Sequence, residues 1–334
     1  MKSESLRFAT IMACAVFTAS GQDNRVAGPV LGYVFDSGNH SIRVIHGVPG
    51  AAVTGPALDL KVEIGSAVFA ASSDWALATA EDGRRVAILR NLAGAADVVW
   101  LPDAAPKPDQ IAINPGGGSA ALYSREQNAA QLLKGLPQAP SIAANIDLSS
   151  IGSEISVWAV SDDAAHILVS SGEGGSDRLY LVDAGGNAKW IVSVGRASAA
   201  ILASNGRDIV VADGLKNAVY WVRDVEGTSE VVPLAGEQDG IAGPVALNIS
   251  GDKQRVLVAN ADSRTIAALP LAGGPPELTF CRCKPEKLDR LGGNDVFLLT
   301  EGAADPLWIF DSGAPESRVL FIPAGEKPAE GGLQ

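Results

Sequence analysis

The sequence predicts an all-β fold, a β-propeller of about seven blades, each a sheet of four short strands. An apolar strand, a polar turn and a second apolar strand recur along the whole chain at spacings of 40 to 49 residues. The 334 residues include 37 glycines and 19 prolines, which suit a chain with many tight turns. No stretch has the periodicity of a long amphipathic helix. A repeat of this length that persists across a whole chain is typical of propellers.

The repeat is clearest at the first residue of the second strand of each recurring pair, which is the third strand of the four expected in a blade. These marker residues are Ile42, Val86, Ala130, Leu179, Val219, Ile266 and Leu307. Each unit has room for four strands of about five to six residues plus turns. Small apolar pieces before each pair, such as Ala67–Ala71 and Val245–Ile249, are predicted to line the central channel as inner strands. Pieces after each pair, such as Val98–Leu101 and Trp190–Val194, are predicted to be outer strands.

The two ends of the repeat predict how the ring closes. The first unit begins at Val30–Asp36, which matches a second strand, so Gln22–Pro29 is expected to supply the inner strand of the first blade. Val319–Pro323 is expected to complete the last blade, with Phe321 packed inward. A ring of this kind has to bury the apolar faces of both its first and its last blade.

Charge argues against two classes of partner. The formal net charge is −12 and the isoelectric point is about 4.7. An acidic surface repels nucleic-acid phosphates and anionic lipid, so neither nucleic acid nor a membrane surface is an expected partner.

The N-terminus has the layout of a secretory signal peptide. Lys2 and Arg7 precede the ten-residue apolar run Phe8–Phe17, and small residues follow it up to Gly21. The run is too short to span a bilayer. We therefore predict a signal peptide over residues 1–21, a propeller over 22–324 and a polar tail over 325–334, located in the periplasm or outside the cell without membrane insertion after cleavage. Lipidation at Cys14 is an alternative processing route.

Removal of the signal would leave Cys281 and Cys283 as the remaining cysteines. A C-x-C pair in an oxidising compartment either closes a small disulfide or stays as two thiols. Two cysteines without nearby histidines do not form a zinc site, so we expect neither a metal nor another cofactor.

Three segments resemble known propeller repeats. Tyr33–Val44 (YVFDSGNHSIRV) is similar to the NHL-repeat signature, and Leu234–Pro244 resembles the glycine-rich segment between NHL blades. Val245–Leu269 resembles the YVTN-type repeat. The resemblance implies a propeller across residues 30–324. It implies little about activity, because these propellers are mostly binding platforms and only some are enzymes.

Polar residues in the turns between second and third strands are the candidate binding residues. These turns are expected on the same side of the ring as the loops that join blades, where polar groups can converge on the channel mouth. The candidates are Asp36, His40, Asp213, Asp262 and Arg264. The structural alternative is that such residues cap turns by bonding backbone N–H groups, and the NHL pattern itself places a histidine at the position of His40.

The sequence favours a non-catalytic binding or scaffold protein that engages a protein or a small ligand. It has no Gly-x-Ser-x-Gly motif, and the predicted inner strands offer mostly Ala, Ser, Ile and Asn. The alternative from another class is a propeller hydrolase or lactonase that acts at the central channel. Carboxylates and a histidine gathered at the channel mouth would favour the enzyme, and a channel lined by small residues would favour the platform. The identity of the ligand is not encoded in any motif.

We predict that the protein is exported and cleaved near Gly21, because a charged flank, a short apolar run and small residues occur in that order. N-terminal sequencing of protein recovered from a periplasmic fraction should begin at or close to Gln22. Recovery of a cytoplasmic product that retains Met1 would contradict the prediction.

Overall fold

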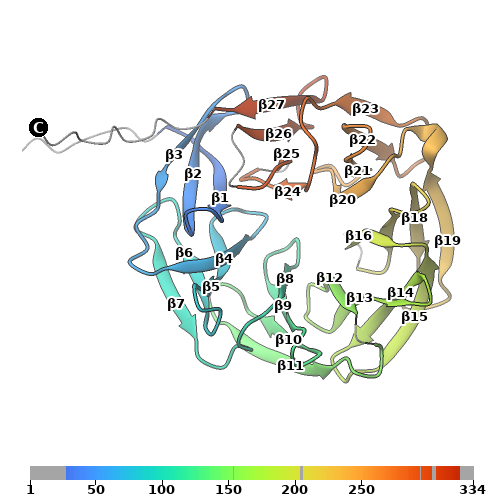
Figure 1. Ribbon diagram of the computed structural model, residues 1–334, viewed down its shortest axis with the longest axis horizontal. Coiled ribbons are helices and arrows are strands. Elements are labelled where there is room, and N and C mark those ends of the chain that lie inside the picture. Colours follow the sequence, from blue (N-terminus) through green and yellow to red (C-terminus); the bar gives the residue numbers. More distant parts are fainter. Residues whose placement is uncertain (1–27, 153, 204–205, 294, 303–305, 324–334) are drawn as a thin grey trace, which may run out of the picture.

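The computed structural model describes residues 28–323, apart from 153, 204–205, 294 and 303–305. Seven antiparallel sheets are arranged in a ring around a central axis (Figure 1). The protein is therefore a seven-bladed β-propeller, and the fold predicted from the sequence is confirmed. Among the described residues, no helix is long and apolar enough to cross a membrane.

Strands run outward from the axis in chain order within each blade. Blade 1 contains β1 (Val30–Asp36), β2 (Ser41–Val48) and β3 (Ala51–Ala57); blade 2 contains β4 (Ile64–Phe69), β5 (Trp75–Ala80), β6 (Val86–Arg90) and β7 (Asp97–Leu101). Blade 3 contains β8 (Gln110–Ile113), β9 (Ser119–Ser124), β10 (Ala129–Lys134) and β11 (Ser141–Asp147); blade 4 contains β12 (Ile155–Val160), β13 (His166–Glu173), β14 (Ser176–Asp183) and β15 (Ala188–Val194). Blade 5 contains β16 (Ala197–Leu202), β17 (Ile209–Asp213), β18 (Ala218–Arg223) and β19 (Glu230–Ala235), followed by the 3₁₀ helix η1 (Glu237–Asp239). Blade 6 contains β20 (Pro244–Ile249), β21 (Arg255–Asn260), β22 (Thr265–Pro270) and β23 (Glu277–Phe280); blade 7 contains β24 (Asp289–Arg290), β25 (Val296–Leu298), β26 (Leu307–Asp311) and β27 (Arg318–Ile322).

The core consists of seven apolar clusters, one between each pair of neighbouring blades. A middle strand contributes to the clusters on both of its faces because alternate side chains point to opposite sides. In β5, for example, Ala76 and Ala78 face blade 1 while Trp75 and Leu77 face blade 3. Burial on both faces explains why second strands such as β5 (WALATA) and β21 (RVLVAN) contain runs of apolar residues.

Blade 1 differs from the others because its sheet has three strands among the described residues. The segment predicted to supply its inner strand, Gln22–Pro29, lies outside the described residues up to residue 27, and Gly28 and Pro29 are not part of a strand. The ring is closed by side-chain packing, in which Leu31 and Val34 of β1 join Leu298 and Ile309 of blade 7 in one cluster.

Close approach at this junction is favoured by a glycine. A Cβ at position 32 would lie 2.9 Å from Leu291 Cδ2 and 3.3 Å from the backbone N of Gly292, so Leu291 would have to shift, and Gly32 lets β1 pack directly against this turn of blade 7.

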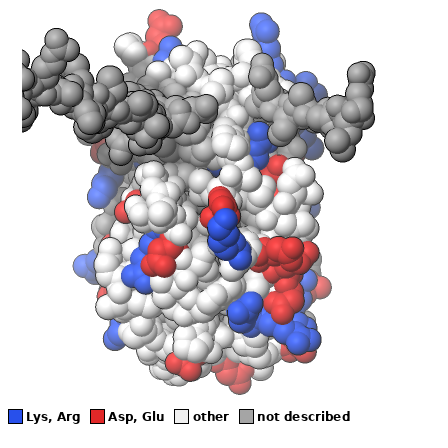
Figure 2. Space-filling model, turned by 90° about the vertical axis from the view of Figure 1, so that its left-hand side faces the viewer, with Lys and Arg blue, Asp and Glu red and all other residues white. Residues whose placement is uncertain are grey.

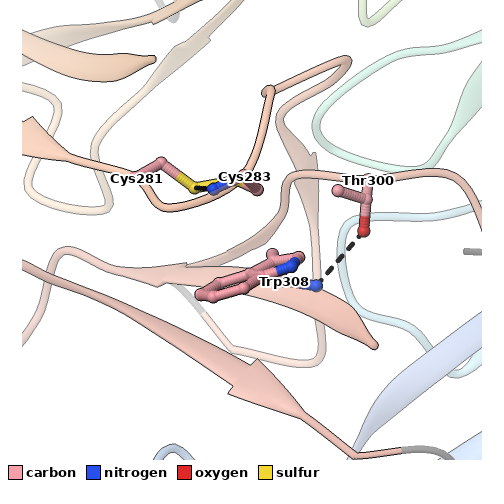
Figure 3. The surroundings of a disulfide bond; sticks show 4 residues. All are labelled: Cys281, Cys283, Thr300 and Trp308. Carbon is pink, nitrogen blue, oxygen red and sulfur yellow. Dashed lines mark hydrogen bonds between the residues drawn. A yellow bond between two sulfur atoms is a disulfide. The ribbon is translucent and has the colours of Figure 1, made fainter. Parts of the chain in front are cut away.

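The cysteine pair forms a disulfide in the loop that follows β23. Both cysteines are buried in the cluster between blades 6 and 7, with Trp308 packed against that cluster (Figure 3). The backbone N–H of Cys281 donates to the carbonyl of Arg264 at 2.7 Å, and the N–H of Trp308 donates to Thr300 Oγ1 at 3.2 Å. Of the two possibilities left open by the sequence, the structure contains the disulfide.

The last strand corrects one expectation. Phe321 does not pack inward: it is 59% exposed, and its ring lies 6.0 Å from that of Trp308 on the outer wall. The neighbouring residue, Ile322, is 1% exposed and joins the cluster that closes the ring between blades 7 and 1. Adjacent residues of a strand face opposite sides, so burying Ile322 places Phe321 outside.

We predict that Ile322→Ala destabilises the protein by about 2–4 kcal/mol, because it removes a fully buried side chain from the ring-closing cluster. Thermal denaturation should show a midpoint lowered by roughly 5 °C or more. Phe321→Ala is the matched control, and its midpoint should change little because most of that ring is already in water. Equal shifts for the two variants would contradict this account of closure.

Candidate ligand-binding face

One side of the ring carries both the turns between second and third strands and the loops that join successive blades. We call this side the turn face. Asp213, at the end of β17, accepts hydrogen bonds from the N–H groups of Gly195 and Arg196 in the loop before β16, at 2.7 and 3.1 Å. Asn128, in a turn of blade 3, donates to the carbonyl of Gly152 in the loop to blade 4, at 2.6 Å. The turns therefore hold the loops in place.

The carboxylates of Asp36 and Asp213 are engaged in this framework. Asp36 is 4% exposed and accepts hydrogen bonds from the N–H groups of Gly38 and Asn39 at 3.1 and 3.2 Å. Asp213 is fully buried and also accepts from the N–H groups of Leu215 and Lys216 at 3.0 Å each. These contacts are those of turn caps, as the structural alternative describes.

His40 and Arg264 occupy the same left-handed turn position as two asparagines. The φ angles are 48° and 55° at His40 and Arg264, and 46° and 49° at Asn128 and Asn217. The asparagine amides anchor the next loop, since Asn217 Oδ1 accepts the N–H of Gly243 at 2.9 Å. Among the described residues, the exposed side chains of His40 and Arg264 make no such hydrogen bond, so they are available to a ligand.

Asp262 lies two residues before Arg264 and is exposed. A Cβ at position 243 would lie 2.5 Å from the Asp262 carboxylate carbon, so this side chain packs directly over Gly243. Within the described part of the chain, no hydrogen bond or ion pair joins any two of the five predicted residues. They belong to blades 1, 5 and 6 and form no single cluster.

A groove opens on the turn face between blades 1 and 2, with a volume of about 800 Å³. Its walls are the turn that carries His40, the loop from Leu58 to Glu63 that joins the blades, and Glu81 at the end of β5. The N–H of Glu81 donates to the carbonyl of Glu63 at 3.2 Å, which fixes the two glutamates side by side.

The two glutamates interact through their side chains. A hydrogen bond to Glu81 and the negative charge of that carboxyl raise the pKa of Glu63, and the nearby charge of His40 opposes the rise. Elsewhere in the groove, a hydrogen bond and ion pair with Lys61 lower the pKa of Asp59. The groove thus combines a paired carboxyl group, a histidine and a neutralised aspartate.

Sequence reasoning identified His40 but missed Glu63 and Glu81. Glu81 directly follows the second strand of its blade, one position after the alignment with Asp36 and Asp213, and Glu63 directly precedes an inner strand. Comparing the residues next to the aligned position, and not only those at it, would have found Glu81. The pairing with Glu63 depends on the path of the loop between blades.

Polar side chains of the inner strands link neighbouring blades. Gln110 Oε1 accepts the N–H of Val157 at 2.7 Å, and Asn248 Nδ2 donates to the carbonyl of Leu288 at 2.9 Å. Among the described residues, no group of three or more His, Cys, Asp or Glu side chains is placed to hold a metal ion. These inner-strand amides act in the packing of the blades.

The wall of blades 1 and 2 is not a uniformly acidic surface. Figure 2 shows acidic and basic side chains side by side on this wall, with large uncharged areas between them. The net charge of −12 is therefore not gathered into one acidic patch there.

Comparisons with solved structures place the chain among β-propellers. A protein of unknown function from Desulfotomaculum acetoxidans matches with a TM-score of 0.60 at 13% identity, over 88% of this chain and 99% of that one. A putative 6-phosphogluconolactonase from Bacteroides fragilis matches with a TM-score of 0.56 at 11% identity, over 88% and 97%. No protein-family model matches, and no curated protein matches significantly. Likeness at this level shows the fold alone.

We predict that Glu63→Gln stabilises the protein at neutral pH. The pKa of Glu63 is raised in the folded state, so the stability that its proton contributes is present at acidic pH and is lost as the pH rises above the ordinary value of 4.5 through the folded-state pKa. The melting temperature of the variant should exceed that of the wild type at about pH 7. At about pH 3.5 the two melting temperatures should be equal. Glu226→Gln, an exposed glutamate of blade 5, is the control. A variant that melts below the wild type at neutral pH would count against the pairing.

Proposed function

We propose that the protein is a non-catalytic binding module whose ligand or partner protein docks on the turn face, at the groove between blades 1 and 2. The groove itself carries the proposal, because it brings together the unanchored His40 and the glutamate pair around a volume of about 800 Å³. A volume of this size lies in the usual range for small-molecule sites.

The repeat type and the location form part of the proposal. In the turn from Asp36 to His40, the Asp36 carboxylate caps the turn and His40 has a left-handed backbone conformation. This turn supports an NHL-type or YVTN-type repeat. The disulfide supports an oxidising compartment, the periplasm or the cell exterior, since such bonds are rare in reducing cytosol. Neither point depends on the identity of the ligand.

A propeller lactonase is the second candidate, because one of the similar folds is a putative 6-phosphogluconolactonase. A reaction at the central channel needs polar groups that are free to touch a substrate. In the described inner strands, Gln110 and Asn248 are engaged with neighbouring blades, and the carboxylate of Asp289 in β24 is paired with Lys287 at 2.7 Å. The first candidate is therefore favoured.

Site-specific photo-crosslinking tests the proposed face. A photoreactive amino acid is placed at position 40 and, as the control, at position 253, an exposed residue with the same left-handed backbone in a turn that joins an inner to a second strand. With exported proteins from the source cells, position 40 should give a discrete adduct that position 253 does not give. Glu81→Lys, which reverses a charge in the groove, should abolish it. Equal adducts at both positions would contradict the proposal.

An assay of lactone hydrolysis distinguishes the binding module from the lactonase. The purified protein should hydrolyse glucono-δ-lactone no faster than buffer does. Protein-dependent hydrolysis that survives Glu81→Lys would replace the proposal with an activity at the channel.

A further inference from the structure

A second groove lies on the outer wall between blades 5 and 6, with a volume of about 260 Å³. It exists because β23 is short. The last strand of blade 6 pairs with β22 only from Thr265 to Ala268, so Leu269 and Pro270 have no outer-strand partner and line the groove instead. Its opposite wall is formed by Trp221 and by β19 of blade 5.

Several residues of the lining have no backbone N–H to donate. Pro233, Pro270 and Pro276 all line it, and proline has no backbone N–H. Trp221 supplies an aromatic surface, and its indole Nε1–H is buried without a hydrogen-bond acceptor among the described residues. A buried donor without an acceptor is uncommon in proteins, and here it belongs to a side chain that lines a groove.

Two charged side chains define what fits between these walls. The guanidinium of Arg223 lies over the Trp221 ring, 4.2 Å from its centre, and its ion pair with Glu230 is long, at 4.0 Å. Asp239 lines the same groove and is held by the N–H of Gly236 at 2.9 Å. The groove therefore presents a cation on an aromatic face and an anion held by a backbone N–H.

Exposed apolar side chains extend the groove along β23. Leu278 is 48% exposed and packs against Gly240, the residue after Asp239. Phe280 is 64% exposed and lies on the same side of β23 as Leu278, since residues two apart share a face. An extended chain lying along this wall would meet Trp221 and then these two side chains.

We propose that this groove binds a proline-containing segment of a partner protein in the polyproline II conformation, with an acidic residue placed at Arg223. Polyproline II segments leave their carbonyls unpaired, which suits the free indole donor, and they dock in aromatic-lined grooves. The acidic residue draws the guanidinium away from the Trp221 ring and opens the indole to a peptide carbonyl. This site is independent of the groove on the turn face.

Fluorescence anisotropy with three labelled decapeptides tests the proposal. One is proline with a single central glutamate, the second has lysine in place of that glutamate, and the third is a glycine–serine peptide with the same glutamate. The first should bind more tightly than the other two. Trp221→Phe, which keeps an aromatic ring and removes the donor, should weaken binding about fivefold, the value of one hydrogen bond. Arg223→Gln should remove the preference for glutamate over lysine.

Two controls and three contrary outcomes make the test decisive. Trp190→Phe, at an exposed tryptophan of β15 in blade 4, should change nothing, and neither should Glu81→Lys in the turn-face groove. Equal binding of the proline and glycine–serine peptides, or binding unaffected by the Trp221 and Arg223 variants, would overturn the proposal. Self-association that Arg223→Gln abolishes, without peptide binding, would assign the groove to a second copy of the chain and would also overturn it.

Discussion

The face-to-face packing of neighbouring blades is the interaction on which the rest of this structure depends. Each blade is a small sheet that buries little by itself, and it becomes stable only when both faces are covered by neighbours. The seven clusters show that this condition is met around the whole ring, including the junction between blades 7 and 1. Polar groups such as Asp213 and Gln110 then fix how each blade sits against the next, by bonding backbone N–H groups of the adjoining segment. The grooves are places where this packing is incomplete.

The fold could be predicted from the sequence because the constraint acts on every blade in the same way. The marker residues from Ile42 to Leu307 lie in or at the start of third strands, since each of those strands is covered on both sides. Outer strands such as β3 (AAVTGPA) and β23 (ELTF) were missed, because one edge faces water and packing places fewer demands on their composition. Phe321 was assigned to the wrong face for a related reason: hydrophobicity does not state which of two adjacent apolar residues points inward.

The candidate site was predictable only in part. The side of the ring follows from the order of strands within a blade, so the sequence was enough to place the turns that carry Asp36, His40, Asp213, Asp262 and Arg264. Which residues of those turns anchor a loop and which stay exposed could not be predicted. Asp213 accepts backbone N–H groups of the adjoining loop, whereas the side chain of His40 is exposed. The glutamate pair depends on the course of residues 58–63, and the outer groove depends on the early end of β23. Neither feature leaves a motif in the sequence.

The left-handed turn position has a consequence for how such a ring diversifies. Its backbone requirement is modest, about 1–2 kcal/mol for a residue other than glycine, and it is met here by His, Asn and Arg alike. The same site in successive blades can therefore exchange an amide that tethers a loop for a side chain that faces outward, without altering a strand or an interface between blades. A duplicated blade would thus acquire new recognition chemistry through a single codon, at the cost of one loop-anchoring hydrogen bond.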